Sequence, residues 1–301
     1  MEECIHLDLE IFTITTAVIL CGLAIIHAIF DGSSNRIQRL LMLATLFIYG
    51  IFLEYIGIMS GHHYYAEETV MFFEVVPLSI PLAWVGIIYS AMIIAEHLKL
   101  SLWMRILTTT FIALSLDWGM DPISVDLGLW TWTHEGGSFF GIPSFNFTGW
   151  FLIPIAFLIP YNLNWSTEKK RLRILTIREI DNNDSMNRKI YTLFLVVPLG
   201  LILMMGIGSI TLVPFFYNLP LVIVIIFEFL TILIASFMII FNFQNLKRVN
   251  WYDLIPPIVL IYVAYSHILL GFFTGQIVLS IHMILTTFPL VLALIFTLWK
   301  R

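Results

Sequence analysis

Long apolar segments alternate with short polar stretches along almost the whole chain. Each segment is near the ~20 residues that an α-helix needs to cross a bilayer. A helix satisfies its backbone polar groups within itself, so helices are the expected spanning elements. The pattern predicts an all-α, polytopic bundle of about nine spans, with eight as the alternative, forming one membrane domain over residues 1–301. The segments run over roughly 11–30, 40–59, 70–95, 103–120, 146–163, 190–213, 219–241, 253–273 and 277–299.

The basic residues predict how this bundle lies in the membrane. All fifteen Lys and Arg residues fall in or beside alternate connections or at the C-terminus. Because cytoplasmic loops carry an excess of Lys and Arg, we expect the N-terminus outside a cell membrane and the C-terminus in the cytoplasm. These residues are Arg36, Arg39, Lys99, Arg105, Lys169, Lys170, Arg171, Arg173, Arg178, Arg188, Lys189, Lys247, Arg248, Lys300 and Arg301.

Composition narrows the class of protein further. A hydrophobic fraction of 59% with only 12% charged residues excludes a soluble globular chain of this length. The formal net charge of −5 carries little information, since acidic and basic residues are expected on opposite faces. Nucleic acid is therefore not an expected partner, and membrane lipid is. Cys4 and Cys21 predict neither a disulfide framework nor a metal site, and no pattern indicates an oligomeric state.

The connection over about 119–145 is unusually aromatic for an outer loop. Asp121-Pro122 is expected to end the helix that enters it, because a residue before proline disfavours the helical conformation. We expect the segment to fold back onto the membrane surface as a re-entrant or interfacial cap, because its aromatic side chains are more stable when buried than in water. Pro77 and Pro81 likewise predict a kink or a broken helix near the outer end of the third span. The aromatic residues of the loop are Trp130, Trp132, Phe139, Phe140 and Phe145.

Ionisable residues inside apolar spans are the candidates for function, because a charge near the bilayer centre costs about 2.5–3.5 kcal/mol. Nearly all of them share one depth, which predicts a single polar pocket in the outer half of the bilayer. His267 and His282 are also consistent with simple hydrogen bonds between helices. His62, His63 and His134 are expected at the membrane–water interface. The intramembrane set comprises Glu54, Glu74, Asp117, Asp121, Asp126, Glu228, His267 and His282.

Asp117 and Asp121 form the most informative pair of this set. They lie one helical turn apart, beside the aromatic loop. Two such carboxyl groups in a dry site suit one shared proton, because burial and like charge both favour the neutral form. The tryptophans at the same depth fit either an aromatic belt or the wall of a pocket. They are Trp84, Trp118, Trp130, Trp132 and Trp150.

Two stretches carry a resemblance to a known family. They read GHHYYAEETVMFFEVVPLSIPLAWVGIIYSA at 61–91 and LDWGMDPISVDLGLWTWTHEGGSFFGIPSFNFTGW at 116–150. From Glu54 to Trp150 the chain resembles the membrane-bound carotenoid hydratase family, whereas the segments after Trp165 resemble it only in hydropathy. The elements that match in order are Asp117, Asp121-Pro122, Gly128, Trp130-x-Trp132, Gly141-Ile142-Pro143, Asn146-Phe147 and Gly149-Trp150.

The resemblance implies a hydro-lyase of carotenoid biosynthesis. Such an enzyme adds water across the terminal isopropylidene double bond of an acyclic carotenoid, or of another polyprenyl lipid, and gives a tertiary alcohol. Protonating an alkene needs a neutral carboxylic acid, and the carbocation needs aromatic faces, so no metal or other cofactor is expected. The catalytic candidates are Asp117 and Asp121, with Glu74 and Glu54 in reserve. The substrate-binding candidates are Tyr64, Tyr65, Trp84, Trp130, Trp132, Trp150 and Asn146, the last to position water.

Two other classes of protein stay open at this point. A polyprenyl transferase needs Asp-rich magnesium–diphosphate motifs on the cytoplasmic side, and the inner connections carry only Asp181 and Asp184 in a polar run. A transporter or a non-enzymatic lipid or pigment carrier would explain Glu228 near the middle of an apolar span. Pigment analysis in cells that make an acyclic carotenoid distinguishes the hydratase from the carrier.

Overall fold

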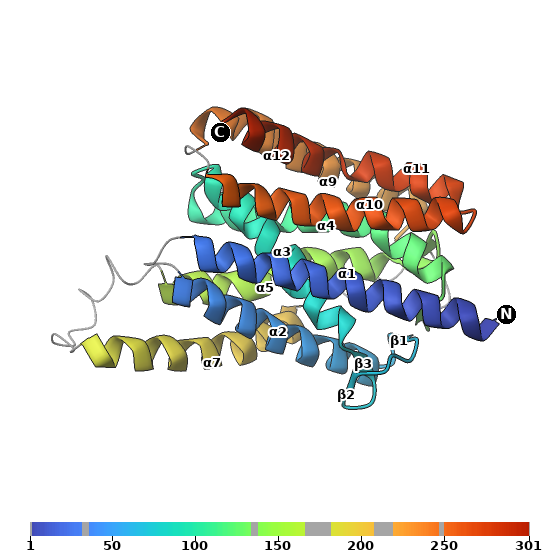
Figure 1. The fold of residues 1–301 in the computed structure, drawn as a ribbon, viewed down its shortest axis with the longest axis horizontal. Coiled ribbons are helices and arrows are strands. Elements are labelled where there is room, and N and C mark those ends of the chain that lie inside the picture. Colours follow the sequence, from blue (N-terminus) through green and yellow to red (C-terminus); the bar gives the residue numbers. More distant parts are fainter. Residues whose placement is uncertain are drawn as a thin grey trace.

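The computed structural model describes residues 2–31, 36–133, 138–165, 182–207, 219–246 and 250–300. Long helices lie side by side in a bundle, and short strands gather at one end of it (Figure 1). The helices are α1 (Glu2–Phe30), α2 (Arg36–Met59), α3 (Ser79–His97), α4 (Leu102–Asp126), α5 (Ser144–Trp165), α7 (Asn182–Ile207), α9 (Leu221–Asn242), α10 (Ile255–Phe273), α11 (Ile277–Thr286) and α12 (Phe288–Trp299), with 3-10 turns η2 (Phe243–Asn245) and η3 (Trp251–Leu254).

The strands form three antiparallel pairs. β1 (His63–Tyr65) pairs with β4 (Trp130–Trp132), β2 (Met71–Phe72) with β3 (Val76–Pro77), and β5 (Ser138–Phe139) with β6 (Ile142–Pro143). The β1–β4 pair joins the α2–α3 connection to the aromatic segment after α4. The described part of the expected cap therefore packs on the bundle, while residues 134–137, which include His134, lie outside the described residues.

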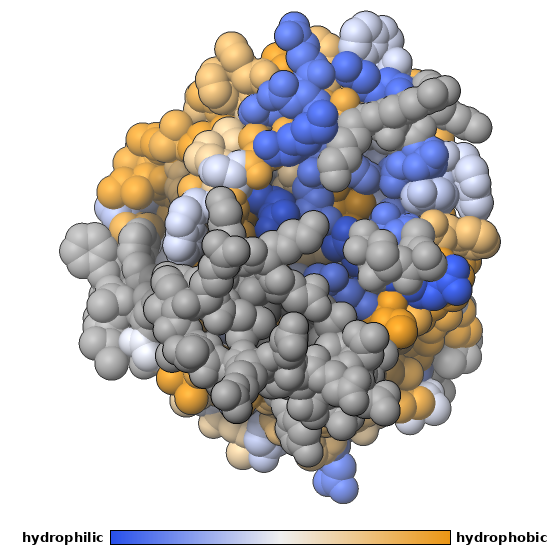
Figure 2. Space-filling model, turned by 90° about the vertical axis from the view of Figure 1, so that its left-hand side faces the viewer, coloured by the Kyte–Doolittle hydropathy of each residue, from blue (hydrophilic) through white to orange (hydrophobic). Residues whose placement is uncertain are grey.

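The bundle has two chemically different ends. We call the end that carries the strands the strand end (right in Figure 1). The opposite end, where α1 and α3 finish and α2 and α4 begin, is the basic end, because the basic residues Arg36, Arg39, Lys99 and Arg105 lie there. Figure 2 looks at the basic end and shows hydrophilic residues gathered between apolar flanks. This distribution is that of a multi-pass membrane protein.

Helices α3 and α4 form the centre of the bundle. α3 packs against α1, α2, α4 and α10, and α4 also packs against α5, α9 and α11. The apolar window of α3 is 78% buried, compared with 22% for α1. Because α4 faces other helices instead of lipid, it tolerates buried polar residues. Thr108, Thr109, Thr110 and Ser124 each donate a hydroxyl hydrogen bond to a carbonyl of the preceding turn.

The structure confirms the all-α polytopic bundle and corrects some boundaries. Each of the nine expected segments contains a described helix. Among the described residues, six helices are long and apolar enough to span a membrane, or seven when the bent pair α11 and α12 is one span, so the count of nine stays a prediction. α4 is not among these because its polar residues lower its hydropathy.

The expectations drawn from three prolines were wrong. α4 does not end at Asp121-Pro122 but continues through Pro122 to Asp126. The third span begins at Ser79, not near residue 70, because residues 70–78 contain β2 and β3. Pro77 lies in β3 and Pro81 in the first turn of α3, where a missing N–H breaks no helical hydrogen bond, so neither kinks a helix.

Candidate active site

A cavity of about 250 Å³ lies among the helices near the strand end. Its walls come from α1, α2, α3, α4, α5, α7 and α10, together with β1 and β4. Apolar side chains form most of the lining, including Phe12, Leu20, Leu53, Ile87, Leu129 and Phe145. A smaller polar set reaches the same space and includes Glu54, His63, Tyr65, Asp121, Asn146 and His267.

Glu54 is the most fully hydrogen-bonded carboxylate of the cavity. Trp84 donates its indole N–H to Oε1 over 2.8 Å, and Tyr65 donates its hydroxyl to Oε2 over 2.8 Å. His63 Nε2 lies 3.1 Å from the same Oε2. Three donors from α3 and β1 thus converge on one buried carboxylate of α2, an arrangement that suits its ionised form.

Tyr65 is held neutral beside this carboxylate. Burial raises the pKa of Tyr65 well above its ordinary value, and the nearby carboxyl groups of Glu54, Asp121 and Asp117 raise it further. Its hydroxyl therefore stays a hydrogen-bond donor. Glu54 of α2 and the two aspartates of α4 thus all lie near the side chain of Tyr65.

Asp117 and Asp121 lie on one face of α4, because residues four apart are neighbours on a helix. Asn146 of α5 donates its side-chain N–H to Asp121 Oδ2 over 2.5 Å and lies 3.4 Å from Asp117 Oδ2. Asp121 lines the cavity, whereas Asp117 is fully buried and its Oδ1 has no hydrogen-bond partner among the described residues.

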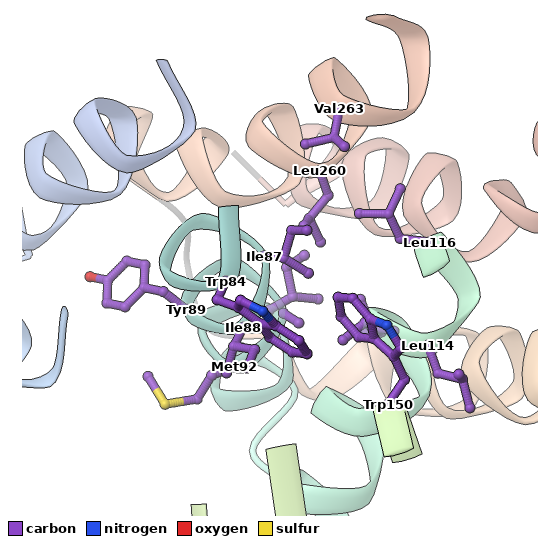
Figure 3. Close-up of a cluster of buried hydrophobic side chains, with 14 of the residues drawn as sticks. Trp84, Ile87, Ile88, Tyr89, Met92, Leu114, Leu116, Trp150, Leu260 and Val263 are labelled. Atoms are coloured by element: carbon purple, nitrogen blue, oxygen red, sulfur yellow. The ribbon is translucent and has the colours of Figure 1, made fainter. Parts of the chain in front are cut away.

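Stacked indoles form one wall of the cavity. Trp84 of α3 and Trp150 of α5 lie 4.1 Å apart between ring centroids, with planes 21° from parallel, and Figure 3 shows the two side by side. Trp132 packs against the ring of His63 at 4.9 Å, and Trp130 against Tyr65 at 5.9 Å. The β1–β4 register explains these contacts, because it places His63 opposite Trp132 and Tyr65 opposite Trp130.

Besides Asp117, which is buried behind Asp121, two candidates from the sequence lie outside the cavity. Glu74 is exposed in the turn between β2 and β3, not near the end of a span, and it has a positive φ. Tyr64 is 55% exposed, because successive side chains of β1 point to opposite sides and its neighbours His63 and Tyr65 face the cavity. Both residues were expected in the site because the third span was drawn too long and β1 was not recognised.

The expected single pocket is divided in the structure. Glu54, Asp121 and His267 line the cavity, but Glu228 and His282 form a separate pair across α9 and α11, with 2.5 Å between Oε1 and Nε2. Asp126 is exposed at the end of α4. The pairing of Glu228 with His282 gives this mid-span carboxylate an interhelical role.

Sequence reasoning underestimated two histidines. His63, which was expected at the interface, contacts Glu54, and the period of two in β1 is the signal that links it to Tyr65. His267 is buried and lines the cavity with Nδ1 2.9 Å from the carbonyl oxygen of Val263. Since Nδ1 donates to that carbonyl, Nε2 is left as an acceptor.

The chain belongs to the carotenoid biosynthesis protein family, whose profile matches residues 13–227. The match includes every element that lines the cavity except α10.

A curated relative is similar over part of the chain. Bisanhydrobacterioruberin hydratase from Haloarcula japonica is 25% identical over 162 residues, which is 50% of this chain and 54% of the relative. The alignment thus spans about half of each protein. No solved structure matches the chain.

Proposed function

We propose that this protein hydrates the terminal isopropylidene double bond of an acyclic carotenoid or a related polyprenyl lipid. Membership of the carotenoid biosynthesis family and similarity to a hydratase support this activity. The observation that carries the proposal is the placement of two kinds of carboxyl group around one apolar cavity. Glu54 has three hydrogen-bond donors, whereas the Asp117–Asp121 pair shares a single amide donor.

Asp121 is the proposed general acid. It lines the cavity, and Asp117 lies behind it as a second carboxyl group without a basic partner among the described residues. Like charge and burial both favour the protonated form of one member of such a pair. Asp121 therefore gives its proton to the CH carbon of the double bond, on the side of the polyene chain. The carbon that bears the two methyl groups then becomes a tertiary carbocation.

The aromatic side chains and Glu54 complete the reaction. The faces of Trp84, Trp150 and Trp132 stabilise the carbocation, because an aromatic face attracts positive charge. Water then bonds to the tertiary carbon and loses a proton to Glu54 directly or through His63. One proton and one hydroxide are added to the alkene, and transfer of the proton from Glu54 back to Asp121 restores the starting state.

The cavity volume indicates which part of the substrate reacts inside the protein. A space of about 250 Å³ lies just below the ~300–1,000 Å³ typical of ligand pockets, so it fits an end group and not a whole long polyene. The rest of such a substrate would remain along the apolar helices or in lipid. This geometry favours reaction at a chain terminus.

The test is expression in cells that accumulate an acyclic carotenoid, followed by mass spectrometry of the extracted pigment. The hydratase proposal expects pigments heavier by one or two waters, and Asp121→Asn should abolish the gain. A host pigment that stays unchanged at full expression of correctly inserted protein contradicts the proposal and favours a carrier. A pigment longer by an isoprenoid unit favours a polyprenyl transferase.

A further inference from the structure

A second cluster of polar residues lies at the basic end, at the opposite end of the bundle from the cavity. His27 lies in the last turn of α1, Asp31 directly follows this helix, and Asp253 lies in η3 before α10. One ligand atom from each of these three residues lies within 4.8 Å of the other two. The reaction proposed for the cavity involves none of these three residues.

We propose that His27, Asp31 and Asp253 bind a divalent transition-metal ion such as Zn²⁺. His27 is fully buried, and its Nε2 has no hydrogen-bond partner among the described residues. That nitrogen lies 3.8 Å from Asp253 Oδ1. Zinc holds nitrogen and oxygen ligands at ~2.0–2.2 Å, which puts tetrahedral ligand atoms ~3.3–3.5 Å apart, so a small side-chain rotation closes the site.

Each proposed ligand is already oriented by a contact on its other side. His27 Nδ1 lies 2.8 Å from the hydroxyl of Tyr89, and in the tautomer whose Nδ1–H donates to this oxygen, Nε2 is an acceptor that can bind an ion. Arg39 donates to Asp31 Oδ2 over 2.8 Å, and the backbone N–H of Asn250 donates to Asp253 Oδ2 over 2.7 Å. One oxygen of each carboxylate is thus held by the protein. His97 Nε2, 3.3 Å from Asp253 Oδ1, offers a fourth nitrogen nearby.

The local charges favour a cation at this place. Among the described residues in and beside the cluster, three carboxylates face two guanidinium groups. The carboxylates are those of Asp31, Glu96 and Asp253, and the guanidinium groups of Arg39 and Arg105 both contact Glu96. The imidazole ligand favours zinc or a similar ion over magnesium, which prefers oxygen ligands. The bound ion would join the end of α1 to the start of α10, beside α3.

Zinc binding by the purified full-length chain tests the proposal. The protein, carrying a tag without histidine, is stripped with a chelator in detergent and dialysed against Zn²⁺. Bound zinc per chain is then measured by mass spectrometry. We expect about one zinc per chain and a higher melting temperature with zinc, because the ion binds only the folded arrangement.

Variants separate this site from other histidines. His27→Gln and Asp253→Asn should lose the zinc, and Tyr89→Phe, which keeps the ring and the fold, should weaken zinc binding about 10–100-fold. His282→Gln is the matched control, because that histidine pairs with Glu228 elsewhere, and it should bind zinc normally. Absence of zinc from the wild-type protein overturns the proposal. So does unchanged affinity in Tyr89→Phe, and either result leaves His27 and Asp253 as an ion pair. Neither outcome depends on hydration activity.

Discussion

At the scale of single residues, the difference between Asp117 and Asp121 decides the proposed chemistry. Both carboxyl groups are buried on one face of α4, but only Asp121 borders the cavity. A proton donor must reach the reacting carbon, whereas its neighbour acts through charge. The same logic separates Glu54, which borders the cavity, from Glu74, which is exposed in a turn.

The aspartates are expected to differ in their tolerance of substitution. Asp121→Asn removes the transferable proton and should lower the hydration rate by at least the ~10²–10⁴-fold that general acid catalysis contributes. Asp117→Asn should lower the hydration rate less, because it changes only the surroundings of the proton donor. Asp126→Asn, at an exposed position of the same helix, is the control and should act normally. Pigment hydration in membranes with matched protein content measures all three, and full activity of Asp121→Asn would refute its role.

The carboxylate of Glu54 is expected to matter for stability as well as activity. Glu54→Gln leaves one acceptor oxygen for three donors, so at least one hydrogen bond to a charged group is lost. We expect the free energy of unfolding to fall by about 1–3 kcal/mol and the hydration rate to fall as well. Thermal unfolding in detergent and pigment hydration measure the two effects. Glu74→Gln is the matched control and should leave both unchanged. Equal behaviour of the two variants would contradict the site.

At the scale of elements, β1 and β4 position the aromatic side of the cavity. The period of two in β1 turns Tyr65 inward to Glu54 and Tyr64 outward. At the other side, α4 approaches α11 so closely that a Cβ on Gly119 would lie 2.9 Å from the Cα of Met283. Short strands and one glycine contact thus hold the central helix and the cap in place.

Tyr65→Phe and Tyr64→Phe test the orientation of β1. Tyr65→Phe removes the hydroxyl that Glu54 accepts, and we expect a loss of about 0.5–1.5 kcal/mol in unfolding free energy together with slower hydration. Tyr64→Phe keeps an exposed ring and should change neither. An effect of Tyr64→Phe as large as that of Tyr65→Phe would show that the strand has the opposite register.

Gly119→Ala tests the close approach of α4 and α11. The added methyl group meets backbone atoms that cannot rotate away, so we expect destabilisation of about 1–3 kcal/mol in thermal unfolding. Gly22→Ala in α1 meets nothing within 4 Å and should be neutral or stabilising by about 0.5–1 kcal/mol. A neutral Gly119→Ala would mean that the two helices are further apart.

These elements also explain which features the sequence could predict. Apolar segments located α1, α2, α5, α9 and α10 well, because hydropathy reports contact with lipid. The end of α4 was missed because burial among helices overrides the tendency of proline to end a helix. Glu74, Tyr64 and His63 were misplaced because strands of two or three residues are too short to be recognised from the sequence. In addition, β1 pairs with β4, which lies far away in the sequence.

At the scale of the whole molecule, the two ends of the bundle have separate chemistry. The proposed reaction lies near the strand end, and the proposed metal site lies at the basic end (Figures 1 and 2). The positive-inside rule predicts that the basic end faces the cytoplasm. The cavity would then open toward the outer half of the bilayer, where an apolar end group enters from lipid.

Cysteine labelling in intact cells checks this orientation. In a background that lacks Cys4 and Cys21, Tyr64→Cys at an exposed position should react with a membrane-impermeant maleimide added from outside. A cysteine introduced into the 166–188 segment should react only after the cells are opened. The reverse pattern would invert the topology.

The central claim, acid-catalysed addition of water, is tested most directly with isotopically labelled water. Membranes that contain the protein are incubated with an acyclic carotenoid in D₂¹⁸O. Mass spectrometry then locates the isotopes in the product. Protonation by an exchangeable carboxyl group followed by water attack predicts one carbon-bound deuterium and one ¹⁸O for each hydrated end, and neither with Asp121→Asn. A hydroxylated product without carbon-bound deuterium, or with oxygen from O₂, would contradict hydration.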